Sequence, residues 1–113
     1  MNVKTKKLNA LFVREINNIV MFDVKDPNLN LVSVTEVEVA NDLSMAKVYV
    51  SIINQKNRSH SLEALKKAKG FIKSELAKRM TIRKIPDLVF IYDDTLDKAQ
   101  RIENIINKIN MGE

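Results

Sequence analysis

The side chains best suited to chemistry in this sequence are basic ones, concentrated between Leu62 and Lys84. This stretch holds eight lysines and arginines against two glutamates, a net charge of +6, whereas the whole 113-residue chain carries +5. Few carboxylates are therefore available to pair with these cations along a helix. A basic excess confined to one element is typical of a polyanion-binding surface, so the sequence predicts a nucleic-acid contact here. The alternative is a solvated helix face rich in lysines.

The candidate contact residues extend over this stretch and its flank. They are Lys66, Lys67, Ala68, Lys69, Gly70, Lys73, Lys78, Arg79, Arg83 and Lys84. Lys6 and Lys7, near the N-terminus, join them if the fold brings the first helix close to the basic stretch.

Gly70 lies inside the basic stretch, which otherwise has the pattern of a helix. Glycine within a helix costs about 1 kcal/mol relative to alanine, and this chain contains two glycines in all. In one straight helix Lys69 would fall within the apolar stripe of Leu62, Leu65, Ile72 and Leu76. We therefore expect a break near Gly70 that separates two shorter helices. The alternative is a continuous helix in which Lys69 reaches solvent along its own methylene groups.

Acidic residues near the C-terminus offer a weaker chemical signal. Asp93, Asp94 and Asp97 cluster where a predicted strand meets a predicted helix, and such carboxylates can hold a magnesium ion. The interpretation that we favour is structural, because Asp94 or Thr95 can cap the helix and Asp97 can complement its dipole.

His60 is the single histidine, and it stands between Ser59 and Ser61. No acidic residue is evident to orient it, so we interpret it as a loop or cap residue rather than as part of a catalytic triad. Glycine patterns of nucleotide-binding loops are absent. We therefore expect no enzymatic activity, no metal and no cofactor.

The composition limits the class of protein. Cysteine is absent, which excludes disulfides, thiolate catalysis and cysteine-based zinc sites. No signal peptide or membrane span is recognisable, so we expect a cytoplasmic protein that does not contact membranes. The length suits a single domain over residues 1–113, which we expect to be a monomer. The basic pI, about 9.5, favours nucleic acid as the partner.

The first half of the chain predicts a helix followed by a β-hairpin. Apolar residues repeat at helical spacing from Lys4 to Val20, and Asp26-Pro27-Asn28 then marks a turn. The strand after Leu31 changes the parity of its apolar residues near Thr35 to Glu36, which indicates either a bulge or cover on both faces. The second strand alternates cleanly, so the pair should form an antiparallel hairpin. Its apolar face consists of Ala46, Val48, Val50 and Ile52.

The second half predicts the basic helical stretch, one strand and a last helix. Ser59 or Ser61 is the candidate helix cap, with Glu63 in the first turn. Leu88 to Tyr92 has the length and apolar character of a strand. The last helix should run from about residue 95 to 109, with a short tail at 110–113. The fold class is therefore α+β, a three-stranded sheet covered by helices.

A short sheet with two successive helices that meet at a glycine resembles the KH domain, whose GxxG loop binds nucleic-acid backbone. Here the corner reads Ala68-Lys69-Gly70, one residue shorter than that loop and with one glycine. Over nearly its whole length the chain resembles the ribosome-binding factor A family, whose members have a type II KH fold with an Ala-x-Gly kink. The residues that carry the resemblance are Asp26-Pro27, Val34 to Val39, Asn41-Asp42-Leu43, Ala46 to Ser51, Ala68 to Gly70, Arg83, Pro86 to Phe90, and Asp93.

The resemblance implies a bacterial ribosome biogenesis factor. Such a protein binds the free small ribosomal subunit or its precursor, assists maturation (rRNA processing) of the 5′ region of the ribosomal RNA and supports growth in the cold. The resemblance also implies release by a ribosome-associated GTPase. Two features depart from the family: the chain ends shortly after Ile109 without a basic extension, and Lys69 and Lys73 stand where arginine is frequent, which gives point-charge rather than bidentate phosphate contacts.

For mechanism we expect Lys66, Lys69, Lys73 and Arg79 to neutralise RNA phosphates, with backbone amides at Gly70 and Phe71 opening a second helix and offering an anion site. The aromatic residues lie mostly at core-pattern positions, which argues against a base-stacking platform. They are Phe12, Phe22, Phe71, Phe90, Tyr49 and Tyr92.

The rival hypothesis is a protein-interaction module with little direct RNA contact. Its partner would be a ribosomal protein or the GTPase, held by the first helix or by an exposed strand edge at Lys47 to Ser51.

Overall fold

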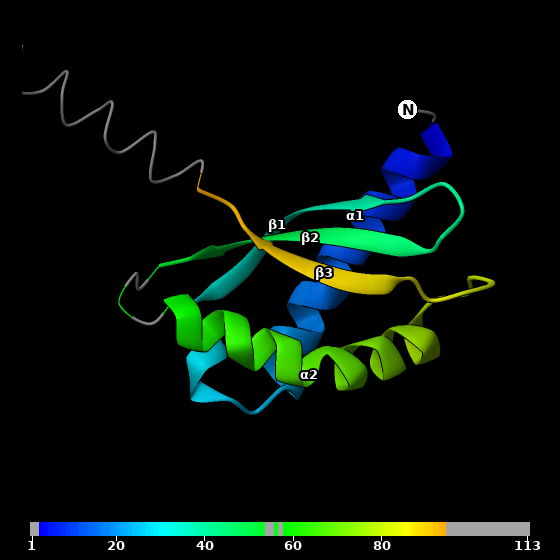
Figure 1. Cartoon of the computed structure of the whole chain (residues 1–113). Helices are drawn as coiled ribbons and strands as arrows, with labels where there is room; N and C mark the ends of the chain where they lie inside the picture. The colour runs from blue at the N-terminus through cyan, green and yellow to red at the C-terminus, as the bar shows by residue number, and fades with distance from the viewer. Residues whose placement is uncertain (1–2, 54–55, 57, 95–113) are drawn as a thin grey trace, which may run out of the picture.

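A computed structural model describes residues 3–53, 56 and 58–94 of the chain. Two long helices, two short helical turns and three strands make up this part (Figure 1). In chain order they are α1 (Val3–Asn18), the π-helical turn η1 (Ile19–Asp23), the 3-10 turn η2 (Pro27–Leu29), β1 (Val32–Val39), β2 (Met45–Ile52), α2 (Arg58–Arg79) and β3 (Asp87–Tyr92). The predicted last helix at 95–109 and the tail lie outside the described residues. Among those residues, no helix is long and apolar enough to span a membrane.

The sheet has the order β1-β2-β3. β1 and β2 form the predicted antiparallel hairpin, whereas β3 pairs with β2 in parallel, with Ala46 opposite Leu88. A parallel pair needs a long crossover, and α2 supplies it. This is the predicted α+β architecture with a KH-like layout.

The strand predictions hold in detail, with one exception. The β1–β2 register shifts between Val34 and Glu36, so the parity change reflects a bulge. On β2 the predicted apolar face is buried, whereas Lys47 is exposed on the other face. The exception is the edge. Because β2 lies between β1 and β3, residues Lys47 to Val50 are paired on both sides, and the prediction of an exposed edge at Lys47 to Ser51 is wrong.

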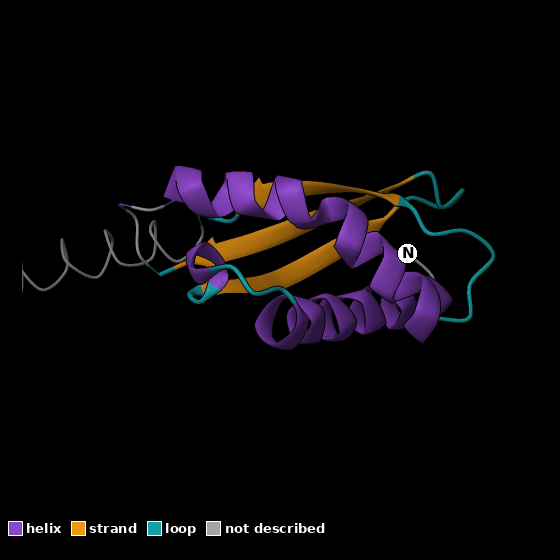
Figure 2. Ribbon diagram, turned by 90° about the horizontal axis from the view of Figure 1, so that it is seen from below, coloured by secondary structure: helices purple, strands orange, loops and turns teal. Residues whose placement is uncertain are grey.

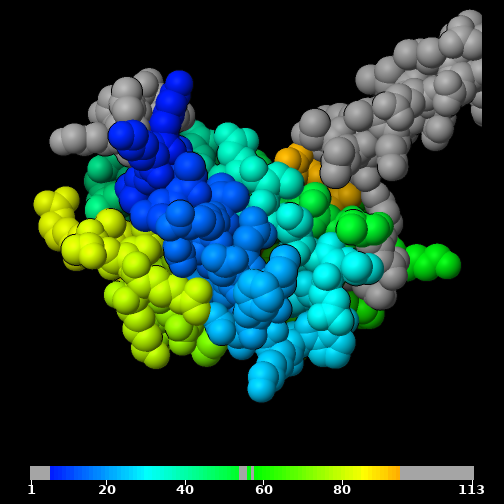
Figure 3. Space-filling view, turned by 180° about the vertical axis from the view of Figure 1, so that it is seen from behind, coloured from blue at the N-terminus to red at the C-terminus, as the bar shows by residue number. Residues whose placement is uncertain are grey.

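The core forms where α1 packs against β1 and α2 packs against β3 (Figures 1 and 2). The buried side of α1 includes Phe12 and Ile16, that of α2 includes Leu65, Ile72 and Leu76, and all five are fully buried. Seen from behind, α1 runs between the C-terminal half of α2 and the segment around β1 (Figure 3). The apolar stripe of α1 is therefore occupied within the fold.

The basic stretch forms one helix, α2, of 22 residues, so the prediction of two separate helices is wrong. Its axis nevertheless changes direction near the middle (Figure 2). Lys69 does not conflict with the apolar stripe, because its side chain lies half-buried at the edge of the stripe with its ammonium group beside Asp87. The alternative of a continuous helix is therefore the better description, with an ion pair added.

The start of α2 also differs from prediction. The helix already includes Arg58, so neither Ser59 nor Ser61 is its N-cap, and Glu63 lies beyond the first turn. Ser61 is instead buried and donates a hydrogen bond of 2.7 Å to the backbone oxygen of Asn28. That bond ties the first half of α2 to the η2 turn.

Candidate nucleic-acid interface

The middle of α2 holds two lysines that share one carboxylate. Nζ of Lys69 and Nζ of Lys73 each lie 3.7 Å from Oδ1 of Asp87, the first residue of β3. The side chains are 34%, 35% and 57% exposed, respectively. Exposed ion pairs at this distance contribute about 0–1 kcal/mol. The two cations are therefore only weakly engaged, and a second anion can approach them from solvent.

Lys66 and Lys67 lie one turn earlier and are exposed. Among the described residues neither has a carboxylate within 4 Å. Lys66 and Lys69 also line a cavity of about 290 Å³ between α2 and β3, whose apolar wall is Leu88, Val89 and Phe90. The sequence predicted the cations, whereas the cavity depends on β3 lying beside the helix.

Gly70 is exposed in the middle of α2, and a Cβ atom placed there would have nothing within 4 Å. Because α2 is continuous, the amides of Gly70 and Phe71 belong to the helix interior, where N–H groups bond to the preceding turn. The predicted anion site at the start of a second helix is therefore wrong. The absence of a side chain at Gly70 leaves a low point on this face of the helix, whereas Ala68 is half-buried and lies about 160° around the helix.

Arg79, at the C-terminal end of α2, has a different environment. Its guanidinium group contacts Asp23 through Nη2, lies 3.8 Å from Oε2 of Glu15 and lies 3.7 Å from Oε2 of Glu75. Its side chain is 30% exposed, about as much as those of Lys69 and Lys73. Arg79 thus joins α2 to α1 and η1, and three carboxylates already compensate its charge.

The remaining predicted cations are dispersed. Lys78 is exposed and lies 3.5 Å from Glu75, and Arg83 is exposed after the end of α2. Lys84 is also exposed and lies near the turn of the hairpin, where the Ser44 hydroxyl donates to Asp42 and, with a smaller contribution from Lys84, lowers the pKa of that carboxyl. Lys6 and Lys7 are exposed on α1. Figure 1 places their end of α1 near the β1–β2 turn, whereas α2 runs below the sheet.

Two aromatic residues depart from the predicted core positions. Phe71 is 44% exposed and Phe22 is 71% exposed, whereas Phe12 is buried and Tyr49, Phe90 and Tyr92 are half-buried. Position 71 lies about 100° around the helix from Ile72, so a stricter use of the apolar phase would have indicated its exposure.

The acidic and histidine candidates are not assembled into a metal site within the part of the chain that the structure describes. His60 is exposed in the first turn of α2, not in a loop. Asp93 accepts a hydrogen bond of 2.8 Å from the Thr35 hydroxyl, which ties the end of β3 to β1. Thr95 and Asp97 lie outside the described residues.

Comparisons with known proteins agree with the fold described above. The family model described as ribosome-binding factor A matches residues 4–106. Ribosome-binding factor A of Macrococcus caseolyticus is 45% identical over 111 residues, which cover 97% of each chain. The crystal structure of ribosome-binding factor A from Thermus thermophilus superposes with a TM-score of 0.72 at 28% identity, covering 78% of this chain and 94% of that one.

A second similar structure comes from a complex of a relative. It is a homology model of the Thermus thermophilus ribosome-binding factor A, fitted into an electron cryo-microscopy map of its 30S complex. Its TM-score is 0.66 at 29% identity, over 77% of this chain and 92% of that chain.

Proposed function

Because this chain belongs to the ribosome-binding factor A family, we propose that it binds the free small ribosomal subunit or its precursor and assists maturation of the 5′ region of the small-subunit RNA. The 30S complex of the Thermus thermophilus relative supports the choice of particle. The protein acts by occupying one conformation of immature RNA, without a catalytic step. Growth in the cold depends on this activity, because misfolded RNA rearranges slowly at low temperature.

The observation that carries the proposed docking surface is the arrangement of cations at the middle of α2. Lys66 and Lys67 have no carboxylate within 4 Å among the described residues, and Lys69 and Lys73 share one exposed carboxylate at 3.7 Å. An RNA phosphate that approaches this surface meets several positive charges and displaces only weak ion pairs. Lysine provides point charges rather than forks, which suits recognition of backbone shape more than of base identity.

Gly70 contributes by its small size, whereas Ala68 lies on the opposite side of the helix. The backbone of an RNA strand can approach the helix closely at this low point, and the lysines on either side then reach its phosphates. The amides of the helix interior take no part. Arg79, with its three carboxylate partners, acts as a structural residue that fixes the position of the basic helix. Arg83, Lys84, Lys6 and Lys7 add long-range attraction.

The alternative function, a protein-interaction module for a ribosomal protein or a GTPase, loses the two surfaces on which it relied. The strand edge is paired, and the apolar stripe of α1 is buried. Release of the protein by a ribosome-associated GTPase remains part of the proposal as a later step.

Co-sedimentation with free small subunits, large subunits and assembled ribosomes, across a salt series, tests the proposal. The protein should be retained on small subunits, and Lys69→Glu/Lys73→Glu should weaken retention about 10- to 100-fold at low salt and reduce the salt dependence by about two phosphate contacts. Urea unfolding of the variant checks that it is folded.

Lys6→Glu/Lys7→Glu is the matched control, because it changes the net charge equally at the far end of α1. A smaller loss for this control supports an interface centred on α2. Equal losses for the two variants, or equal binding to all three particles, would contradict the proposal.

A further inference from the structure

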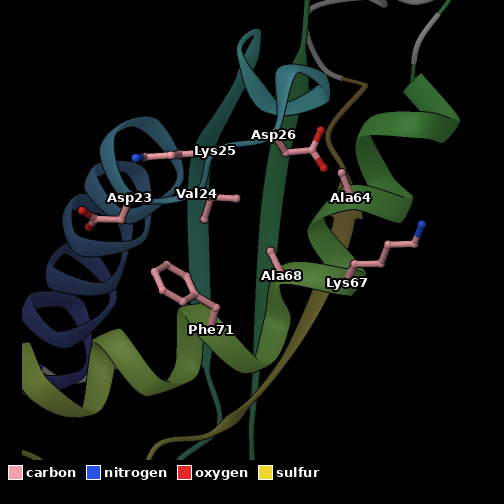
Figure 4. A pocket seen from close by; sticks show the side chains of 8 residues that line it. All are labelled: Asp23, Val24, Lys25, Asp26, Ala64, Lys67, Ala68 and Phe71. Carbon is pink, nitrogen blue, oxygen red and sulfur yellow. The ribbon is translucent and has the colours of Figure 1, made fainter.

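A second cavity lies on the opposite flank of α2 from the groove beside β3. Its volume is about 350 Å³, within the usual range for ligand pockets (Figure 4). We call it the Phe71 cavity. The residues that line it are Asp23, Val24, Lys25, Asp26, Ala64, Lys67, Ala68 and Phe71. At 100° per residue, the α2 residues of this cavity and those of the β3 groove face opposite directions, so the two hollows are separate.

The cavity combines an exposed aromatic ring with small apolar side chains. Phe71 is 44% exposed, and its ring points toward Val24 on the other wall (Figure 4). Ala64 and Ala68 come from the first half of α2, so the helix side of the cavity is low and apolar. A flat, partly exposed ring beside a low wall offers one face for stacking and leaves room for a planar group.

The rim carries two uncompensated positive charges. Lys25 and Lys67 have no carboxylate within 4 Å in the described part of the chain. Figure 4 shows their side chains directed away from the cavity on opposite sides. The two acids are engaged, since Asp23 contacts Arg79 and Oδ1 of Asp26 accepts a hydrogen bond of 3.0 Å from the amide of Asn28.

We propose that the Phe71 cavity receives one unstacked nucleobase of a single-stranded RNA segment. The base stacks on Phe71, and the phosphates before and after it lie near Lys25 and Lys67. Lys67 also belongs to the basic surface of α2, so the strand continues from that surface around the helix. The inference rests on the proposed function, because the RNA bound there supplies the segment. A single-stranded nucleic acid matches the cavity better than a peptide, because it brings a planar ring flanked by two anions.

The test uses single-stranded RNA hexamers of adenine, cytosine or uracil, and an abasic hexamer with the same number of phosphates. Phe71→Leu keeps an apolar side chain and removes the aromatic face. It should weaken binding of the adenine hexamer about 5- to 100-fold and leave the abasic hexamer unaffected. Urea unfolding confirms that the variant is folded. Equal changes for the two hexamers, or no change for either, overturn the proposal.

A second readout follows the ring directly. The chain contains no tryptophan, so Phe71→Trp introduces a single fluorophore. Its emission should fall when the adenine hexamer binds, and the emission of the matched variant Ile53→Trp should not, since Ile53 is exposed and lines neither hollow. Emission of Phe71→Trp that responds to no hexamer, or that changes equally in the two variants, would overturn the proposal.

Hexamer binding and retention on small subunits together distinguish failure of the nucleobase site from failure of the proposed function. If small subunits are retained through Lys69 and Lys73 while the Phe71 variants behave as wild type, the nucleobase site alone is wrong. If neither hexamers nor small subunits bind, both the site and the proposed function are wrong.

Discussion

The middle and the C-terminal end of α2 are both basic, yet their cations have different surroundings. At the middle, Lys69 and Lys73 share one exposed carboxylate at 3.7 Å, and Lys66 and Lys67 project into solvent. At the end, Arg79 is surrounded by Glu15, Asp23 and Glu75 from three elements. The same charge therefore stabilises the fold at one position and remains available to a ligand about two to four turns away. The number and exposure of the partners decide which role a cation has.

The largest effect that separates these regions should come from Arg79→Met. The substitution keeps much of the side-chain length but leaves three carboxylates, 15–35% exposed, without their shared partner. Partial exposure limits the penalty, so the free energy of unfolding should fall by about 1–2 kcal/mol, measured by urea denaturation. The affinity of the folded protein for small subunits should change little.

Lys78→Met is the control for this prediction. It removes a neighbouring charge whose side chain is 69% exposed and pairs with one residue, so stability should change by less than about 0.5 kcal/mol. If Lys78→Met and Arg79→Met are equally stable, the distinction between the two regions does not hold.

A smaller effect is expected at Gly70, between the two regions. Since the helix is continuous and nothing lies within 4 Å of the added Cβ, Gly70→Ala should stabilise the protein by about 0.5–1 kcal/mol. Ala77→Gly, the reverse change at another exposed position of α2, should destabilise it by a similar amount. A loss of stability in Gly70→Ala would show that the change of direction in the helix requires glycine.

The smallest expected effect concerns Asp87, the carboxylate that Lys69 and Lys73 share. If this carboxylate only occupies Lys69 and Lys73 until a phosphate arrives, Asp87→Asn should raise the affinity for small subunits about two- to fivefold at low salt. Glu38→Gln removes an equal charge from an exposed position on the other edge strand and should have a weaker effect. A fall in affinity for Asp87→Asn would mean that Asp87 positions the lysines rather than competing for them.

Much of the fold could be predicted from local patterns. The spacing of the apolar residues predicted α1, the hairpin and β3, and the parity change near Thr35 indicated the bulge. The predicted break at Gly70 is wrong because a lysine near the apolar stripe causes no conflict when its ammonium group reaches a carboxylate. In the structure Asp87 supplies that carboxylate, from a position 18 residues later in the chain.

The sequence by itself determined the elements, the faces of the strands and the concentration of positive charge on one helix, since periodicity and composition are local properties. The tertiary structure decided which of those cations are free. The contact between Arg79 and Asp23 joins residues 56 positions apart, and the Phe71 cavity needs the η1–η2 segment to lie against α2. The energy of a charge or an exposed ring depends on what lies within a few ångströms of it, and only the folded chain places those neighbours.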